Sequence, residues 1–75
     1  MSKLDREAFK NVWPSPYVAR KSVSEFSGGA LSPRTLANCD SKGRGPKDRI
    51  MIGRQICYPI DSLLDWMESI AHQRG

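Results

Sequence analysis

Side chains that could recognise a nucleic acid lie close together in one stretch of this chain. Arg34, Asn38 and Ser41 are four and three residues apart, a spacing that places them on one face of a helix. Thr35 and Lys42 border this face. Guanidinium, amide and hydroxyl groups can hydrogen-bond to base edges in a DNA major groove, and the cations attract phosphates. A helix exposed only to water could carry the same residues, so the flanking chain must decide between the two interpretations.

The segment around these residues, 31–47, has clear signals for a short helix. Ser32 can act as the N-cap, and Pro33 suits the first helical position, where a missing N–H costs nothing. Gly43 and the Gly45-Pro46 pair stop the run. Leu36 points away from the polar face and would anchor the helix to a core. The sequence therefore predicts a helix of roughly ten residues that begins at Pro33.

The charge distribution favours a polyanionic partner. The 75-residue chain carries a formal net charge of +4, and its size fits one small domain with a modest core. Basic residues gather in the middle of the sequence: Arg34, Lys42, Arg44, Lys47, Arg49 and Arg54. Beyond Gln55, acidic residues outnumber basic ones. A cationic central segment is typical of chains that bind nucleic acid.

No arrangement of residues indicates catalysis. His72 is the single histidine and lies far from any candidate nucleophile, and Gly43-Arg44-Gly45 precedes a proline rather than a helix that could hold phosphate. Cys39 and Cys57 have no metal-binding spacing; we expect reduced thiols, with a disulfide between them the alternative. We therefore expect no enzyme activity, no metal and no cofactor. The absence of a transmembrane run or an apolar signal segment predicts a cytoplasmic protein.

The first 16 residues form an N-terminal arm or short helix with a proline-rich linker. Ser2–Trp13 can form an amphipathic helix, with Ser2 as a cap and with Leu4, Ala8 and Val12 on its apolar side. Such a helix could cover the core or reach a neighbouring molecule. Trp13-Pro14-Ser15-Pro16 breaks it, so residues 17–75 make up the domain proper.

A second helix and a glycine turn are predicted before the polar helix. In Val18–Ser27, Ala19, Val23 and Phe26 form an apolar stripe, and Arg20 and Lys21 lie near its start, where they could meet a phosphate. Gly28-Gly29 ends this helix and permits a reversal. A helix, a glycine-containing turn and a capped second helix together make the helix-turn-helix pattern.

A hairpin and a final helix follow. Ile50–Ile52 and Ile56–Tyr58 flank Gly53-Arg54-Gln55, which predicts a two-stranded hairpin with a cationic tip, or wing. Ile60–His72 carries the clearest amphipathic stripe in the chain. We expect the helices and the wing to share a core built from Phe26, Leu36, Ile52, Tyr58, Leu63 and Met67.

Four segments in this order resemble a known family. LSPRTLAN, GRGPK, IGRQICY and IDSLLDWM, within Tyr17–Met67, resemble the small MerR-like winged helix-turn-helix domains of excisionases, or recombination directionality factors. The resemblance implies that the second helix enters the major groove and that the wing contacts the minor groove or its backbone. It gives Arg34, Thr35 and Asn38 the helix role and Arg54 the wing role.

The expected fold is thus α+β, mainly α: a helix-turn-helix, a two-stranded wing and a C-terminal helix. Candidate DNA contacts on the recognition helix are Ser32, Arg34, Thr35, Asn38, Ser41 and Lys42. Candidate contacts from the wing and to the DNA backbone are Arg20, Lys21, Arg44, Lys47, Arg49, Arg54 and Gln55.

Three functions remain open from the sequence. The first is an excisionase that binds and bends double-stranded DNA and directs an integrase toward excision of a mobile element. The second is a small transcriptional regulator of a prophage or mobile element, and the third is a DNA-packaging or protein-interaction module. Expected partners are double-stranded DNA, further copies of the chain along the DNA and a tyrosine integrase, without a membrane. The resemblance implies a bacterial or phage-encoded, nucleoid-associated protein.

Overall fold

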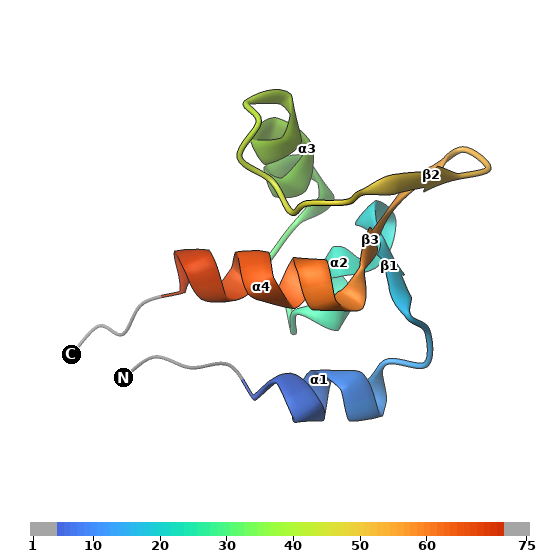
Figure 1. The fold of residues 1–75 in the computed structure, drawn as a ribbon, viewed down its shortest axis with the longest axis vertical. Helices are drawn as coiled ribbons and strands as arrows, with labels where there is room; N and C mark the ends of the chain where they lie inside the picture. Colours follow the sequence, from blue (N-terminus) through green and yellow to red (C-terminus); the bar gives the residue numbers. More distant parts are fainter. Residues whose placement is uncertain (1–4, 72–75) are drawn as a thin grey trace.

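The computed structural model describes residues 5–71, which form a small α+β domain (Figure 1). In chain order the elements are α1 (Arg6–Val12), β1 (Tyr17–Ala19), the 3-10 helix η1 (Arg20–Ser22), α2 (Val23–Phe26), α3 (Pro33–Ser41), β2 (Ile50–Ile52), β3 (Gln55–Pro59) and α4 (Ile60–Ile70). No helix in this described part is long and apolar enough to cross a membrane. Cys39 and Cys57 are both free rather than joined in a disulfide.

The sheet has three antiparallel strands in the order β1-β3-β2, rather than the two strands expected. β3 is central: Val18 of β1 lies opposite Tyr58, and Met51 of β2 lies opposite Ile56. The helix predicted over Val18–Ser27 is wrong in its first part, since Tyr17–Ala19 is a strand and α2 begins only at Val23. Residues 17–19 form a strand rather than a helix because they pair with β3. A two-stranded hairpin alone is marginal in water, and β1 gives β3 a second partner.

The core lies between the sheet, α2, α3 and α4. Its buried residues are Val18, Val23, Phe26, Leu31, Leu36, Tyr58, Leu63, Leu64, Trp66 and Met67. Five of the six predicted core residues are among them, but Ile52 is 50% exposed. Ile52 lies at the end of β2, beside the turn of a hairpin that projects from the body of the molecule (Figure 1). The apolar alternation is correct there, but no helix covers that end of the strand.

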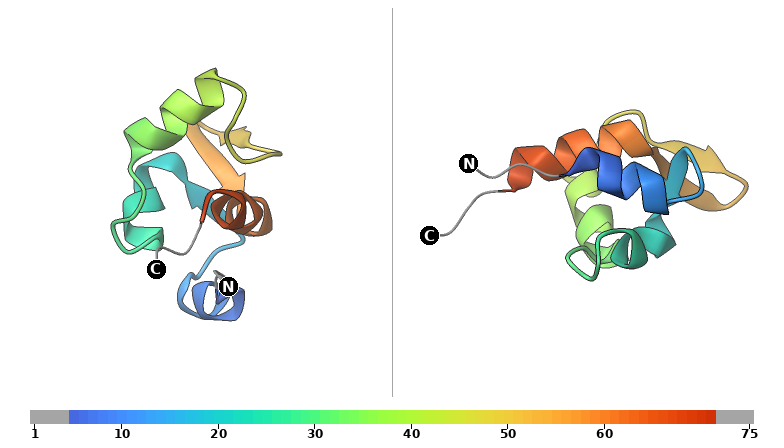
Figure 2. Two further views of the ribbon diagram at one scale, coloured as in Figure 1. Left: turned by 90° about the vertical axis from the view of Figure 1, so that its left-hand side faces the viewer. Right: turned by 90° about the horizontal axis from the view of Figure 1, so that it is seen from below.

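The N-terminal helix covers the molecule's own core. α1 lies beside α4 on the side opposite α3, as Figures 1 and 2 show. Phe9 and Trp13 contact the ring of Phe26, with centroid distances of 5.1 and 5.3 Å. The predicted apolar side, Leu4, Ala8 and Val12 with Phe9 beside them, is wrong for Ala8, which is exposed, and for Val12, which is 78% exposed; Phe9 does face the core.

The predicted terminal helices differ from the observed ones at the start of α1 and at the end of α4, whereas α4 begins at Ile60 as predicted. Asp5 caps α1, accepting a hydrogen bond from the Ala8 N–H at 3.1 Å. The proposed Ser2 cap and Leu4 lie outside the described residues, as does His72, the predicted end of the last helix. α4 ends at Ile70, the last residue of the apolar stripe, and Ile70 is 46% exposed.

Candidate nucleic-acid interface

The predicted polar helix is present as α3, with the start that the sequence indicates. Ser32 is its N-cap: the Ser32 Oγ accepts a hydrogen bond from the Thr35 N–H at 3.2 Å. Pro33 occupies the first turn, and the helix ends at Ser41. Leu36 is fully buried on the inner face. The apolar anchor that the sequence assigned to this helix is therefore confirmed.

The outer face of α3 offers three unpaired polar side chains. Arg34, Asn38 and Lys42 are exposed, and their side chains make no hydrogen bond or ion pair within residues 5–71. The hydroxyls beside them are engaged locally. Ser32 Oγ and Thr35 Oγ1 are 2.9 Å apart, and Ser41 Oγ donates to the Asn38 carbonyl at 3.0 Å. A guanidinium, an amide and an ammonium group are thus the groups on this face available to a ligand.

The inner face of α3 is held by a buried carboxylate that the sequence reasoning missed. Asp40 Oδ2 accepts hydrogen bonds from the Tyr58 hydroxyl at 2.6 Å and from Arg20 Nη2 at 2.5 Å. The Tyr58 hydroxyl also accepts from Arg20 Nε at 3.0 Å. Burial raises the pKa of Tyr58 to about 12, and the hydrogen bond to Tyr58 raises that of Arg20. These three side chains tie α3 to η1 and β3.

Arg20 therefore faces inward, and its guanidinium is committed to Asp40 and Tyr58. In this structure Arg20 positions α3, and the phosphate contact suggested by its place in the sequence stays a prediction. The sequence does place Asp40 on the Leu36 side of the helix, four residues further on, but that spacing alone does not show that the carboxylate is an anchor. The distant partners Arg20 and Tyr58 carry no such signal.

The loop after α3 is closely fitted to the same carboxylate. Asp40 Oδ1 is buried without a hydrogen-bond partner in the described part of the chain, and Arg49 Nη1 lies 3.6 Å from it. A Cβ added at Gly45 would collide with this oxygen. The loop thus passes so near α3 that only glycine fits at position 45. The guanidinium of Arg49 also lies close enough to Asp40 for an ion pair.

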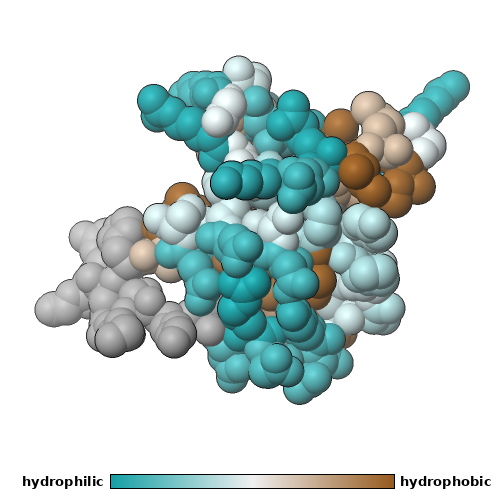
Figure 3. Space-filling model, in the orientation of Figure 1, coloured by the Kyte–Doolittle hydropathy of each residue, from teal (hydrophilic) through white to brown (hydrophobic). Residues whose placement is uncertain are grey.

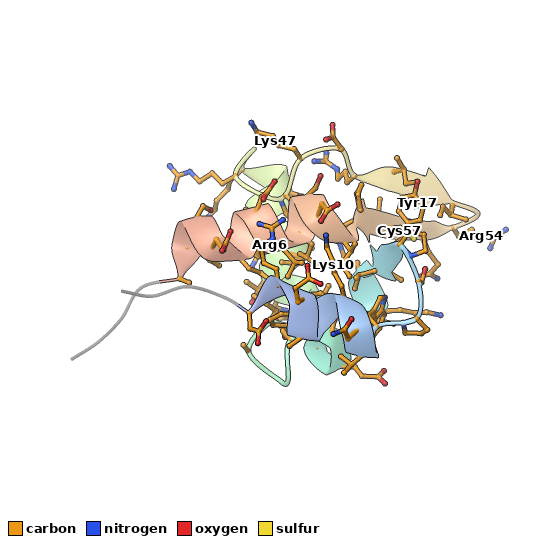
Figure 4. The ribbon with its side chains drawn as sticks, turned by 60° about the horizontal axis from the view of Figure 1, so that its bottom comes forward. Arg6, Lys10, Tyr17, Lys47, Arg54 and Cys57 are labelled. Atoms are coloured by element: carbon orange, nitrogen blue, oxygen red, sulfur yellow. The ribbon has the colours of Figure 1, made fainter. Side chains whose placement is uncertain are left out.

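The remaining cations are exposed around this loop and the hairpin. Arg44 and Lys47 lie in the loop between α3 and β2, and the Arg44 carbonyl accepts a hydrogen bond from Trp66 Nε1 at 2.7 Å. Arg54 and Gln55 lie at the hairpin tip, where Arg54 projects outward (Figure 4). Lys21 is exposed at η1. The side chains of Lys21, Arg44, Lys47 and Arg54 form no ion pair within the described residues.

A depression beside the loop carries charges of both signs. It has a volume of about 440 Å³ and lies between the loop and α4, with Arg44, Lys47, Asp48 and Asp65 among its lining residues. The mixture of cations and carboxylates does not favour one charged ligand, so this depression adds no separate site to the interface on α3.

Comparison with known proteins leaves the residues and their geometry as the basis for a function. No protein-family model matches the chain, and a search of curated proteins finds no match.

Proposed function

We propose that this chain is a sequence-specific DNA-binding protein with a winged helix-turn-helix, in which α3 is the recognition helix and the β2–β3 hairpin is the wing. One observation carries the proposal. α3 is fixed from behind by Leu36 and Asp40, while its outer face presents Arg34, Asn38 and Lys42 without partners among the described residues. A rigid helix with free donors on its outer face is what readout of the major groove requires.

The exposed cations next to α3 support phosphate contacts on either side of the groove. Arg44 and Lys47 follow the C-terminal end of the helix, and Arg54 projects from the tip of the hairpin. Acidic residues of α4 are paired with α1, where Arg6 Nη1 lies 2.6 Å from Asp65 and 2.8 Å from Glu68. The connection from α2 to α3 is longer than a tight helix-turn-helix turn, with Gly28 and Gly29 at φ values of 68° and 91°.

We further propose that the biological role is that of an excisionase, which bends DNA at an attachment site. The support is the resemblance of four ordered sequence segments to the MerR-like excisionase family. One short helix and one hairpin cover only a few base pairs, and single modules of this kind bury about 600–1,000 Å² of protein surface. Several copies along the DNA would supply the missing affinity.

The first experiment separates base readout from phosphate attraction. Duplexes selected from a random-sequence pool provide a specific site, and a scrambled duplex provides the nonspecific control. Arg34→Ala should lose about 1–3 kcal/mol of discrimination between the two, whereas Lys47→Ala should weaken both complexes alike and reduce the salt dependence. Equal losses on both duplexes for Arg34→Ala would remove α3 from base readout.

The second experiment distinguishes an excisionase from a regulator. Footprints are compared on the attachment-site fragment of the mobile element and on the promoter fragment upstream of the gene, and excision is measured with purified tyrosine integrase. Protection of the attachment site with stimulated excision supports the proposal. Protection of the promoter alone, with no effect on excision, would make the chain a transcriptional regulator.

A further inference from the structure

The hairpin leaves one apolar strand edge open. β2 consists of Ile50, Met51 and Ile52, which are 39%, 61% and 50% exposed. β3 is its only strand partner within residues 5–71, so one side of β2 is unpaired. Figure 3 shows a hydrophobic patch over this hairpin, with a hydrophilic tip beyond it. Exposed edge strands in proteins are usually protected by charge, proline or a cover, and the three residues of β2 carry none of these.

The turn of the hairpin determines which backbone groups face outward. Gly53 has a φ of 61°, and Ile52 lies opposite Gln55, which indicates a two-residue turn of type II′. Residues that flank such a turn form a hydrogen-bonded pair, and these pairs alternate along an antiparallel ladder. Ile50 and Ile52 therefore use their N–H and C=O groups toward β3, whereas those of Met51 face the free edge.

The sequence around Met51 is self-complementary in an antiparallel arrangement. When two β2 strands pair about Met51, Ile50 of one copy lies opposite Ile52 of the other. Asp48 and Arg54 lie in the turns just beyond the two ends of β2, where Asp48 has a φ of 62° and accepts a hydrogen bond from Ser62 Oγ at 3.5 Å. In this pairing the turn that carries Arg54 in one copy lies next to the turn that carries Asp48 in the other. Both Asp48 and Arg54 are exposed, and neither forms an ion pair within the described residues. Parallel pairing would instead bring like charges together at both ends, which is unfavourable.

We propose that the free edge of β2 is the surface on which a second copy of this chain docks, with two-fold symmetry about Met51. The two sheets then form one six-stranded sheet, with an Asp48–Arg54 pair at each end of the central β2–β2 seam. A three-residue strand pair buries far less than a stable interface of about 1,200–2,000 Å², so the association is weak and reversible. This dimer rests on the proposed function in one respect: it is the contact by which neighbouring copies would meet on DNA. The experiments that test it contain no DNA, so their failure is distinguishable from a failure of DNA binding.

The backbone of Met51 provides the first test. Proline is tolerated in an edge strand where the N–H faces solvent, so Met51→Pro should leave β2–β3 intact and block the free edge. Sedimentation velocity at protein concentrations of about 0.1–1 mM, the range of a weak complex, should show reversible dimers for the parent and monomers for Met51→Pro. Met51→Thr, which keeps the N–H, should still dimerise. Thermal melting verifies that each variant folds.

The end charges provide the second test, because symmetry makes the variants complementary. Arg54→Glu alone and Asp48→Lys alone each place two pairs of like charges in the dimer, and association should fall roughly tenfold. An equimolar mixture of the two variants restores both pairs and should associate as well as the parent. Lys21→Glu, an equal charge change away from β2, should have no effect.

Three outcomes would overturn the proposal: a parent protein that stays monomeric up to about 1 mM, dimers of Met51→Pro as strong as those of the parent, or a mixture no better than the single variants. If the hairpin contacts DNA and not a second copy, a different pair of results is expected. Met51→Pro would then lower the affinity for one short duplex, while the parent remained monomeric without DNA.

Discussion

Asp40 shows how one side chain can position a whole surface. Its carboxylate receives hydrogen bonds from Arg20 and Tyr58 and faces Gly45 across the following loop. A carboxylate with hydrogen-bonded partners can be buried at acceptable cost, whereas an unpaired one cannot. The angle at which α3 presents its outer face is therefore fixed by polar contacts and by the burial of Leu36.

Removing the charge of Asp40 should weaken the fold measurably. In Asp40→Asn, the hydrogen bonds from Arg20 and Tyr58 lose their charged acceptor, and the free energy of unfolding should fall by about 1.5–3 kcal/mol. Urea denaturation measures the change. Glu7→Gln, at an exposed residue with no ion pair in the described part of the chain, should stay within about 0.5 kcal/mol of the parent. An equally stable Asp40→Asn would show that the carboxylate is not an anchor.

The phenol of Tyr58 should make the fold sensitive to alkali. Burial raises the pKa of Tyr58 from 10.0 to about 12, so the folded state holds this proton more tightly than the unfolded chain. The resulting stability is fully present below about pH 10 and is lost as the pH rises through about 12. Phenolate absorbance should show a late transition that Tyr58→Phe lacks. A Tyr58 phenol that ionises near pH 10 in the folded protein would contradict this assignment.

At the scale of elements, α1 is held to α4 by charge and to Phe26 of α2 by ring contacts. Arg6 reaches Asp61, Asp65 and Glu68 of α4, and Lys10 Nζ lies 2.6 Å from Asp61. Figure 4 shows Arg6 and Lys10 turned toward that helix. The hydrogen bond from Lys10 lowers the pKa of Asp61. Because these ion pairs between α1 and α4 lie at the surface, the pH and the salt concentration of the solution should affect their strength.

Docking of α1 should respond to mutation, acid and salt together. Arg6→Ala should lower the free energy of unfolding by about 1 kcal/mol, since exposed pairs contribute only a few tenths each. The ion pairs of Asp61 stabilise the folded state fully at pH values above the usual pKa of a carboxyl group. This stabilisation is lost as the pH falls through the lowered pKa of Asp61. NaCl at about 1 M should screen the same pairs. The NMR signal of the Trp13 indole N–H, which donates to the Tyr17 carbonyl at 2.9 Å, reports docking.

Arg34→Ala is the matched control for this experiment, because Arg34 is an exposed arginine without an ion pair among residues 5–71. It should leave both the stability and the Trp13 signal unchanged. If Arg6→Ala behaves like Arg34→Ala, ring contacts with Phe26 alone hold α1, and the ion pairs contribute nothing.

Local signals in the sequence suffice for some elements and fail for others. The start of α3 follows from Ser32 and Pro33, and α4 follows from its apolar period. β1 could not be predicted, because a three-residue strand is stabilised by pairing with β3, far along the chain. Its residues also fit a helical period that runs into α2. The burial of Asp40 has the same cause, since Arg20 and Tyr58 come from distant segments.

At the scale of the whole molecule, the two sides differ in what they offer. α3 and the hairpin lie on the side away from α1 (Figure 1). α3 and the loop after it carry Arg34, Lys42 and Lys47, which form no ion pair with any residue from 5 to 71. The acids of α4 face the cations of α1. If the chain binds DNA as proposed, the face with α3 and the hairpin contacts the DNA, and the opposite face is covered by α1.

If copies assemble on DNA as proposed, arrays should bend it and bind cooperatively. Mobility shift on one selected site and on two tandem sites measures cooperativity, and circularly permuted duplexes measure bending. Tandem sites should bind more tightly per copy and migrate as bent DNA, since each copy adds neighbour contacts and curvature. One isolated site that binds as tightly as the array, on straight DNA, would favour a plain regulator.

The position of β3 at the centre of the sheet has a consequence for how the protein is made. β3 and α4 lie late in the sequence, yet β1 pairs with β3 and α1 docks on α4. A nascent chain that has emerged from the ribosome only as far as the hairpin turn cannot complete the sheet or dock α1 on α4. Completion of the sheet and docking of α1 on α4 must therefore wait for the last third of the chain, and until then the apolar residues that β3 and α4 cover stay available to chaperones.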